Sequence, residues 1–142
     1  MHHCQRMGKE YDLRARTMQF ALDVFVLCRQ FPDTQEARHV RGQLFRAGTG
    51  LAANYRAASR GRSTPDFIAK LGTAIEEGDE SDFWMEFSAR AALLKRESES
   101  RLRREVNELL AILVQSRITA QSNLERRKRE KEAGKPRNDN EC

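Results

Sequence analysis

The sequence predicts an all-α protein that folds as an antiparallel, up-and-down four-helix bundle. Glycine and proline are rare, at 8 and 3 of 142 residues, so the chain has too few turn residues for a fold with many strands. Alanine, leucine, arginine and glutamate dominate, and all four are good helix formers. Apolar residues recur every three or four positions in four segments, so each segment has one stripe to bury. Short connections between such helices favour an antiparallel bundle.

The first two helices are predicted over residues 9–31 and from residue 34 or 35 to residue 59. The first ends at Phe31, because a residue that precedes a proline is disfavoured in helical conformation. Gly61 supplies a stop after the second. The apolar stripe of the first helix consists of Leu13, Phe20, Ala21, Val24, Leu27, Cys28 and Phe31. The stripe of the second consists of Val40, Leu44, Ala47, Leu51, Tyr55 and Ala58.

The third and fourth helices are predicted over residues 65–95 and 100–123. Thr64 is expected to cap the third helix, because its hydroxyl can accept a hydrogen bond from the first turn and Pro65 fits the first helical position. The polar segment 95–100 contains neither glycine nor proline, so one bent helix is an alternative to two separate ones. The stripe of the fourth helix consists of Leu102, Val106, Leu109 and Leu113.

One folded domain is expected over residues 9–125, between a flexible N-terminus over 1–8 and a charged, disordered tail over 126–142. No apolar run approaches the roughly 20 residues that cross a bilayer. The three cysteines are odd in number and scattered, which argues against a disulfide framework. We therefore expect a cytoplasmic protein without membrane contact.

Charge is segregated along the chain. Residues 35–65 hold six arginines and one acidic residue, a balance of +5. Residues 66–99 hold four basic and nine acidic residues, a balance of −5, and residues 100–132 return to +4. Because the whole chain carries only +5, this alternation indicates distinct charged surfaces and not a uniformly basic protein.

Five arginines of the second helix lie on the side that faces away from its apolar stripe. At 100° per residue, Arg38, Arg56 and Arg60 fall within about 40° of one another, Arg46 lies at about 80° and Arg41 at about 300°. The stripe lies between about 180° and 260°. A guanidinium group binds phosphate through two parallel hydrogen bonds, so this face is predicted to bind nucleic acid. Further basic residues are expected to assist: Arg101, Arg103 and Arg104 of the fourth helix, and Arg126, Arg127, Lys128 and Arg129 of the tail.

Two other interpretations of the basic face remain open at this point. The arginines are simply solvated, or they pair within the bundle with carboxylates of the third helix, namely Glu76, Glu80 and Glu86. The same carboxylates could also meet the arginines of a neighbouring subunit.

No spacing of reactive residues predicts catalysis, a metal or a cofactor. The run His2-His3-Cys4 is terminal and His39 is distant, so no structural zinc site is expected. Cys28 lies on an apolar helix face and is expected to be a buried, unreactive thiol. The carboxylate run 76–82 lacks the Glu-x-x-His pairs of di-metal bundles. An enzyme would also need a buried polar pocket, for which four thin stripes leave little room.

Residues 41–84 resemble a known family in their pattern of arginine, glycine and aromatic positions. The matching positions are Arg41, Gln43, Leu44, Arg46, Ala47, Ala52, Ala53, Asn54, Tyr55, Ala57, Arg60, Gly61, Ser63, Phe67, Ile68, Leu71, Ala74 and Glu77. This pattern is similar to the four-helix-bundle proteins encoded by intervening sequences in bacterial 23S ribosomal RNA genes. More distantly, it resembles the accessory proteins of diversity-generating retroelements. The likeness covers about the first 95 residues, and Phe31-Pro32 also fits it.

The resemblance implies a homopentameric ring with a basic surface and no catalysis, and for the retroelement branch it implies RNA and a reverse transcriptase as partners. The chain departs from the family in having Gly50-Leu51-Ala52 where a proline often interrupts helix two. Its segment after residue 95 is also longer and more basic.

The leading hypothesis is a cytoplasmic, non-catalytic homo-oligomer that binds nucleic acid, preferably RNA, through phosphate contacts. No aromatic-rich stacking platform is evident in the sequence, so little base selectivity is expected. The alternative is a protein-interaction scaffold whose charges serve solubility and subunit pairing.

Overall fold

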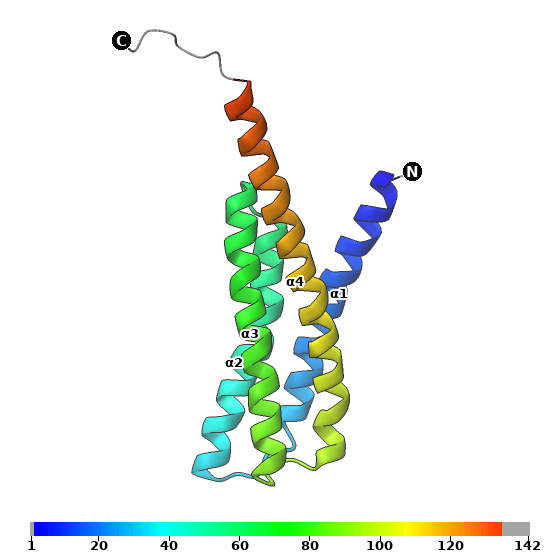
Figure 1. The fold of residues 1–142 in the computed structure, drawn as a ribbon. Coiled ribbons are helices and arrows are strands. Elements are labelled where there is room, and N and C mark those ends of the chain that lie inside the picture. Colours follow the sequence, from blue (N-terminus) through cyan, green and yellow to red (C-terminus); the bar gives the residue numbers. More distant parts are fainter. Residues whose placement is uncertain (1, 135–142) are drawn as a thin grey trace, which may run out of the picture.

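The computed structural model describes the backbone of residues 2–134 and the side chains of residues 13–134. Four helices account for nearly all of it, and the described residues contain no strand. The helices are α1 His2–Cys28, α2 Gln35–Ser59, α3 Thr64–Arg90 and α4 Arg96–Ala133. Consecutive helices run side by side in opposite directions (Figure 1), and α4 closes the bundle against α1. The predicted all-α, four-helix bundle is confirmed.

The predicted apolar stripes meet in a single core. Val24 of α1, Leu44 and Leu51 of α2, Leu71 of α3 and Leu109 of α4 are fully buried there. Each helix covers its stripe only by packing on its neighbours, so the four helices fold as one unit. The α1–α4 contact is the least extensive of the four helix pairs.

Both α2 and α3 begin with a capping side chain that accepts a hydrogen bond from a backbone N–H of the first turn. The Thr34 hydroxyl accepts a hydrogen bond from the Ala37 backbone N–H (3.2 Å) at the start of α2. At the start of α3 the capping residue is Ser63 and not the predicted Thr64, since the Ser63 hydroxyl accepts from the Asp66 N–H (3.2 Å). The cap moves back by one residue because Thr64 already has helical conformation.

A turn separates α3 from α4, so the alternative of one bent helix is wrong. The α3 helix ends at Arg90, five residues before the predicted end. The Leu93 N–H reaches back to the Ser88 carbonyl (2.9 Å), and Ala92 between them has a positive φ of 57°. Such a left-handed residue ends a helix without glycine or proline, at a cost of about 1–2 kcal/mol for a residue with a Cβ.

The outer helices extend beyond their predicted ends. The α4 helix continues to Ala133, so residues 126–133 are helical where a disordered tail was expected. This stretch contains strong helix formers and an Arg126–Glu130 pair one turn apart (3.8 Å), and Gly134 follows it. The backbone of α1 is helical from His2, within the segment expected to be flexible, but ends at Cys28 instead of Phe31.

Some expectations fall on residues that the structure does not describe. Residues 135–142 of the predicted tail lie outside the described residues, as do the side chains of His2, His3 and Cys4. Over residues 2–134, no helix is both long enough and apolar enough to cross a membrane.

Gly48 sets the distance between α1 and α2. A Cβ placed on Gly48 would lie 2.9 Å from a methyl carbon of Val24, closer than two carbon atoms approach without displacement. Val24 is fully buried, and its branched side chain has one strongly preferred rotamer in a helix. The two helices therefore pack at a separation that only glycine permits. By contrast, a Cβ on Gly42 of the same helix would meet no atom within 4 Å.

Substitution of Gly48 should therefore destabilise the bundle, whereas substitution of Gly42 should not. We expect Gly48→Val to lower the free energy of unfolding by about 1–3 kcal/mol, because the larger side chain forces α1 and α2 apart. Gly42→Ala should raise it by about 0.5–1 kcal/mol, because alanine favours the helix and the site is open. Urea unfolding followed by circular dichroism measures both. Equal midpoints for the two variants would contradict the close packing.

Candidate nucleic-acid interface

The arginines of α2 lie on its solvent-facing side, opposite the buried stripe. Arg38, Arg46, Arg56 and Arg60 are exposed and Arg41 is half-buried. The helix is thus apolar toward the core and basic toward solvent, as predicted. The side chains around the predicted site residues, however, divide them into arginines that form ion pairs within the bundle and arginines that do not.

Arg46 is already neutralised by α3. Its guanidinium group lies 2.7 Å from a carboxylate oxygen of Glu80 and 3.6 Å from one of Glu77. The Glu77 carboxylate lies against Gly50, where a Cβ would come within 3.0 Å of it, and its Oε2 atom is buried without a hydrogen-bond partner among the described atoms. A phosphate that binds Arg46 would compete with these carboxylates. The alternative of pairing within the bundle therefore holds at Arg46.

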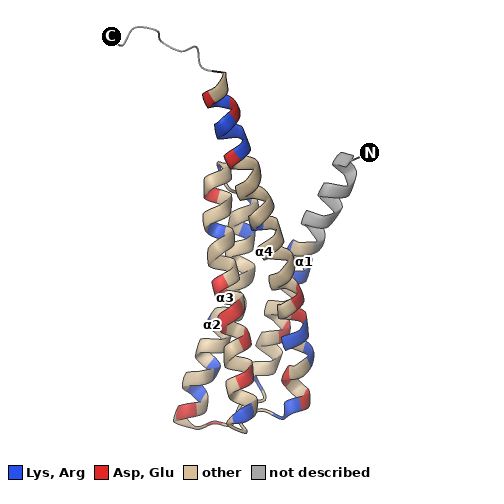
Figure 2. Ribbon diagram, viewed as in Figure 1, with Lys and Arg blue, Asp and Glu red and all other residues tan. Residues whose placement is uncertain are grey.

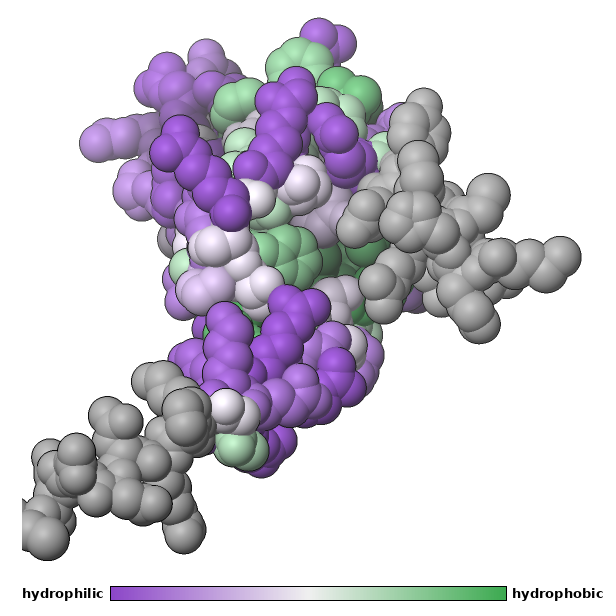
Figure 3. All heavy atoms as spheres, turned by 90° about the horizontal axis from the view of Figure 1, so that it is seen from above, coloured by the Kyte–Doolittle hydropathy of each residue, from purple (hydrophilic) through white to green (hydrophobic). Residues whose placement is uncertain are grey.

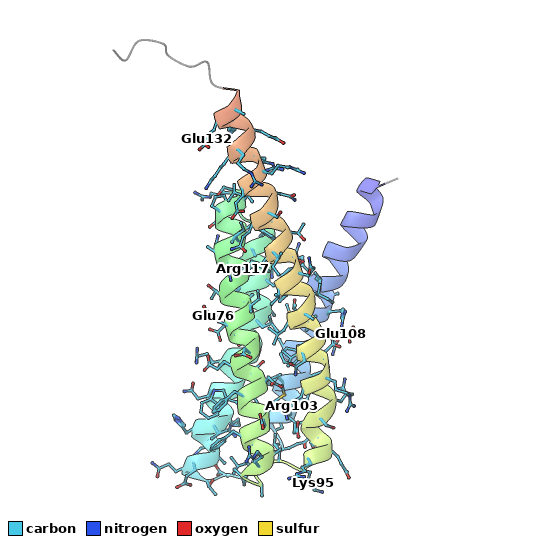
Figure 4. The ribbon with its side chains drawn as sticks, in the orientation of Figure 1. Glu76, Lys95, Arg103, Glu108, Arg117 and Glu132 are labelled. Carbon is cyan, nitrogen blue, oxygen red and sulfur yellow. The ribbon has the colours of Figure 1, made fainter. Side chains whose placement is uncertain are left out.

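Two arginines of α4 are also paired inside the molecule. Arg103, labelled in Figure 4, donates to Asp82 of α3 (2.9 Å) and also lies 3.4 Å from Glu86. The hydrogen bond to Asp82 holds the pKa of Arg103 above its ordinary value. Arg101 lies 3.6 Å from Asp23 of α1. Both pairs join α4 to a neighbouring helix, but only Arg103 is largely enclosed by its carboxylates, whereas Arg101 is 68% exposed and its pair contributes little to stability.

Arg38 and Arg104 add little to a specific phosphate-binding site. Arg38 lies 3.2 Å from Asp33, but both side chains are largely exposed, and such a pair contributes only about 0–1 kcal/mol. Arg104 is exposed on the lower half of α4, and no ion pair joins it to another described side chain.

One group of unpaired cations lies at the end of the bundle where α2 meets α3. Arg56, Arg60 and Arg62 are exposed around a shallow hollow of about 420 Å³, and over residues 13–134 no carboxylate forms an ion pair with them. Lys70 lines the same hollow but pairs with Asp66 (3.0 Å). We call Arg56, Arg60 and Arg62 the end cluster.

The end cluster is unpaired because of the antiparallel packing of α2 and α3. The C-terminal half of α2 lies beside the N-terminal half of α3, where the one acidic residue before Glu76 is Asp66. Asp66 pairs with Lys70 (3.0 Å) and accepts a hydrogen bond from the Arg62 backbone N–H (3.2 Å), but forms no ion pair with the guanidinium groups of the end cluster. The acidic run begins at Glu76 and lies beside the N-terminal half of α2, where it reaches Arg46. The charge segregation along the chain thus becomes a charge gradient along the bundle axis.

The basic end of α4 projects from the same end of the bundle. This helix continues past the α2–α3 turn (Figure 1), and its last turns are rich in lysine and arginine (Figure 2). The basic residues of this stretch are Arg126, Arg127, Lys128, Arg129 and Lys131, and all are exposed. They were predicted to assist from a disordered tail, but the structure presents them on a helix.

An apolar cleft opens beside these cations. It has a volume of about 680 Å³, is bounded by all four helices, and lies at the end shown in Figure 3. Its walls come from Leu13, Tyr55, Ala58, Ser59, Gly61, Phe67, Ala111, Ile112, Gln115 and Ser116. The expectation from the sequence concerned a buried polar pocket, and this cleft is open and mainly apolar. Among residues 13–134, the lining contributes no carboxylate, imidazole, thiol or amine, the groups that acid–base catalysis most often uses.

Arg41 lies away from the end cluster, in a groove between α1 and α2. Phe25, Arg29 and Phe45 line the same groove, which has a volume of about 290 Å³. The sequence analysis missed this arrangement, because the two phenylalanines lie on different helices and neither belongs to a stripe. Cys28 forms its buried edge, and burial raises the pKa of its thiol to about 11, as expected for an unreactive cysteine.

Glu99 is a buried carboxylate in the first turns of α4. It is 5% exposed, and its Oε2 atom has no hydrogen-bond partner among the described atoms. Burial raises the pKa of Glu99, although Arg103 opposes this shift. A carboxyl whose pKa is raised by folding stabilises the folded state in its protonated form and is unfavourable once ionised.

Glu99→Gln should therefore stabilise the protein at neutral pH. The gain should be largest at pH 7, shrink as the pH falls through the raised pKa of Glu99, and vanish below the ordinary glutamate value of about 4.3. Glu97→Gln, an exposed position in the same helical turn, is the control and should show no such pH dependence. Thermal unfolding of both variants from about pH 3.5 to about pH 8 measures this difference, because the range includes both the ordinary glutamate pKa of about 4.3 and neutral pH. A less stable Glu99→Gln protein at pH 7 would contradict a buried ionised carboxylate.

Comparison with known proteins places this geometry in a family. The sequence model described as 23S rRNA-intervening sequence protein matches residues 9–115. A crystal structure of a protein with unknown function from the S23 ribosomal protein family of Bacteroides thetaiotaomicron VPI-5482 has a similar fold. Its TM-score is 0.71 at 27% identity, covering 77% of this chain and 97% of that chain. A search of curated proteins found no match. The family match covers α2 and α3 completely, α1 from residue 9 and α4 as far as residue 115. Because it spans most of the chain, the chain belongs to the 23S rRNA-intervening sequence protein family.

Proposed function

We propose that the protein is a non-catalytic, self-associating bundle that binds RNA through phosphate contacts at the end where α2 meets α3. The observation that supports this proposal is the end cluster, three exposed arginines whose guanidinium groups form no ion pair with a described carboxylate. The basic end of α4 projects beside it, outside the matched segment 9–115. The family's association with 23S rRNA favours RNA as the polyanion.

The proposed site is smaller than the basic face predicted from helix two. A guanidinium group gains most from a phosphate when no carboxylate already satisfies its hydrogen bonds. Arg46 and Arg103 fail this condition, since each has a carboxylate within 3 Å. Arg56 and Arg60 meet it among the described side chains. The site proposed here is therefore limited to the C-terminal end of α2 and does not extend along the whole helix.

Neutralising Arg56 and Arg60 together should weaken RNA binding. Arg56→Gln/Arg60→Gln should reduce the slope of log affinity against log salt by about 1.4–1.8, because two phosphate contacts are lost at 0.7–0.9 each. Fluorescence anisotropy with a structured RNA, titrated at several salt concentrations, measures the slope.

The matched control removes the same charge from the same helix. Arg38→Gln/Arg46→Gln also lowers the net charge by two, but removes arginines that already have carboxylate partners, so its salt slope should change less. Equal effects of the two double variants would show that only net charge matters. If the RNA affinity of the unsubstituted protein did not change with salt concentration, the RNA proposal would be contradicted.

Two exposed apolar surfaces support self-association. One is the outer face of α1, with Met18, Leu22 and Val26 each about half exposed. The other is on α3, where Phe83 and Phe87 are 54% and 43% exposed. Since α1 and α3 make no direct contact, the surfaces lie at diagonal corners of the bundle. Contact between two different surfaces gives head-to-tail assembly, which closes into a ring when the rotation permits. The subunit number of five is a prediction of the resemblance.

A charged side chain on either surface should break the assembly. Leu22→Lys and Phe83→Lys should each lower the mass measured by light scattering, because a lysine cannot be buried at an apolar contact without a partner. Val114→Lys is the control, since Val114 is 41% exposed on α4 and belongs to neither surface. A parent protein that stays monomeric at micromolar concentration would exclude this part of the proposal.

The apolar cleft favours a second candidate, a scaffold that binds another protein. Its volume of about 680 Å³ and largely apolar walls suit a side chain cluster of a partner helix. On this alternative, charge reversal at Arg56 and Arg60 would disturb assembly or partner capture and leave RNA behaviour unchanged. A reverse transcriptase as that partner stays a prediction of the resemblance alone.

A further inference from the structure

The groove between α1 and α2 places two exposed aromatic rings beside two arginines. The rings of Phe25 and Phe45 have centroids 6.2 Å apart and are tilted by 55°, so they contact each other without covering each other's faces. They are 42% and 43% exposed. The guanidinium group of Arg29 lies 4.7 Å from the centroid of Phe25. Arg41 completes the lining on the α2 side.

The groove has space for a planar group. Gly42 forms part of its lining, and a Cβ at this position would meet no atom within 4 Å. The volume of about 290 Å³ is therefore open to solvent beside the ring of Phe45, while Arg29 occupies a face of Phe25. A flat ligand would accordingly stack on Phe45.

The charge of the groove is entirely positive. Among residues 13–134, no carboxylate forms an ion pair with Arg29 or Arg41. Cys28 adds no negative charge, because its thiol is buried with a pKa of about 11 and donates to the Arg41 carbonyl (3.8 Å). The groove therefore suits a ligand that carries both a flat apolar face and negative charge.

A polynucleotide has both features, but only where its bases are unpaired. In a duplex the base faces are covered by their neighbours, whereas a single strand or loop can turn a base onto an aromatic side chain. We propose that this groove binds an unpaired nucleotide of the RNA, with its base stacked on Phe45 and its flanking phosphates on Arg29 and Arg41. The proposal rests on the proposed function and specifies the form of RNA that binds.

The groove is also within reach of the end cluster. Phe45 and Arg56 are eleven positions apart on α2, or about 16 Å at 1.5 Å per residue. One RNA strand along α2 can therefore place a base in the groove and phosphates on the end cluster.

The outer face of α1 lies next to the groove but has a different composition. Met18, Leu22 and Val26 are exposed apolar side chains without a ring, which suit the centre of a subunit contact. The groove instead combines each phenylalanine with an arginine, which suits a charged ligand.

The test compares single-stranded with duplex RNA on the full chain. The probe is an oligoribonucleotide that carries one 2-aminopurine, whose fluorescence falls when it stacks on an aromatic ring. Phe45→Leu removes the ring and keeps apolar bulk at a half-exposed position, so folding should be retained. This variant should weaken single-strand binding about fivefold or more and abolish the quenching, because stacking contributes strongly per base. Its affinity for the same sequence as a duplex should not change.

Ile118→Ala is the control, because it removes exposed apolar surface on α4, outside the groove and outside the two surfaces proposed for self-association, and should leave single-strand binding and quenching intact. If Phe45→Leu leaves single-strand affinity and quenching unchanged while salt-dependent binding persists, the groove proposal fails and the proposed function stands. If Phe45→Leu weakens binding but Arg56→Gln/Arg60→Gln does not, the end cluster fails and the groove stands. A lower mass of Phe45→Leu in light scattering would assign the groove to a subunit contact and overturn the proposal.

Discussion

The packing of α2 between α1 and α3 is the constraint on which the other features depend. Its apolar stripe is buried against both neighbours, and Gly48 permits the approach of Val24 that sets the α1–α2 separation. Once the stripe is buried, the direction of every arginine on α2 is determined by its angle around the helix. Arginines on the edge toward α3 meet carboxylates, and Arg41 on the edge toward α1 lies near phenylalanines.

Ion pairs divide the bundle along its axis. Carboxylates of α3 neutralise Arg46 of α2 and Arg103 of α4 in the half that contains the acidic run. In the other half of α3 the one acidic residue before Glu76 is Asp66, which pairs with Lys70, so no carboxylate of that half forms an ion pair with the end cluster. Partly buried pairs between helices fix the relative positions of those helices, whereas the exposed end cluster contributes little to stability. Structural and binding roles of arginine are thus spatially separated in this protein.

The two proposed functions, RNA binding and self-association, use different surfaces of the bundle and can therefore occur together. The apolar surfaces on α1 and α3 lie at diagonal corners, while the end cluster and the end of α4 lie at one end of the bundle. A head-to-tail assembly of such subunits would bring several end clusters to the same side of a ring. Repeated weak phosphate contacts would then act together, since linked sites bind with an effective concentration that single sites lack.

The sequence by itself determined the helical class, the four apolar stripes and the solvent-facing side of α2, because these depend on local propensity and on the 3.6-residue period. Helix ends were less predictable: Ser63 caps α3 in place of Thr64, and Ala92 ends α3 without glycine or proline. Only the tertiary structure decided which arginines are free, because Arg46 and Arg56 look alike in sequence and differ only in what α3 places beside them. It also brought Phe25 and Phe45 together from separate helices, which no local pattern records. Pairing and stacking depend on distances across helices, and those distances are set by how the helices pack.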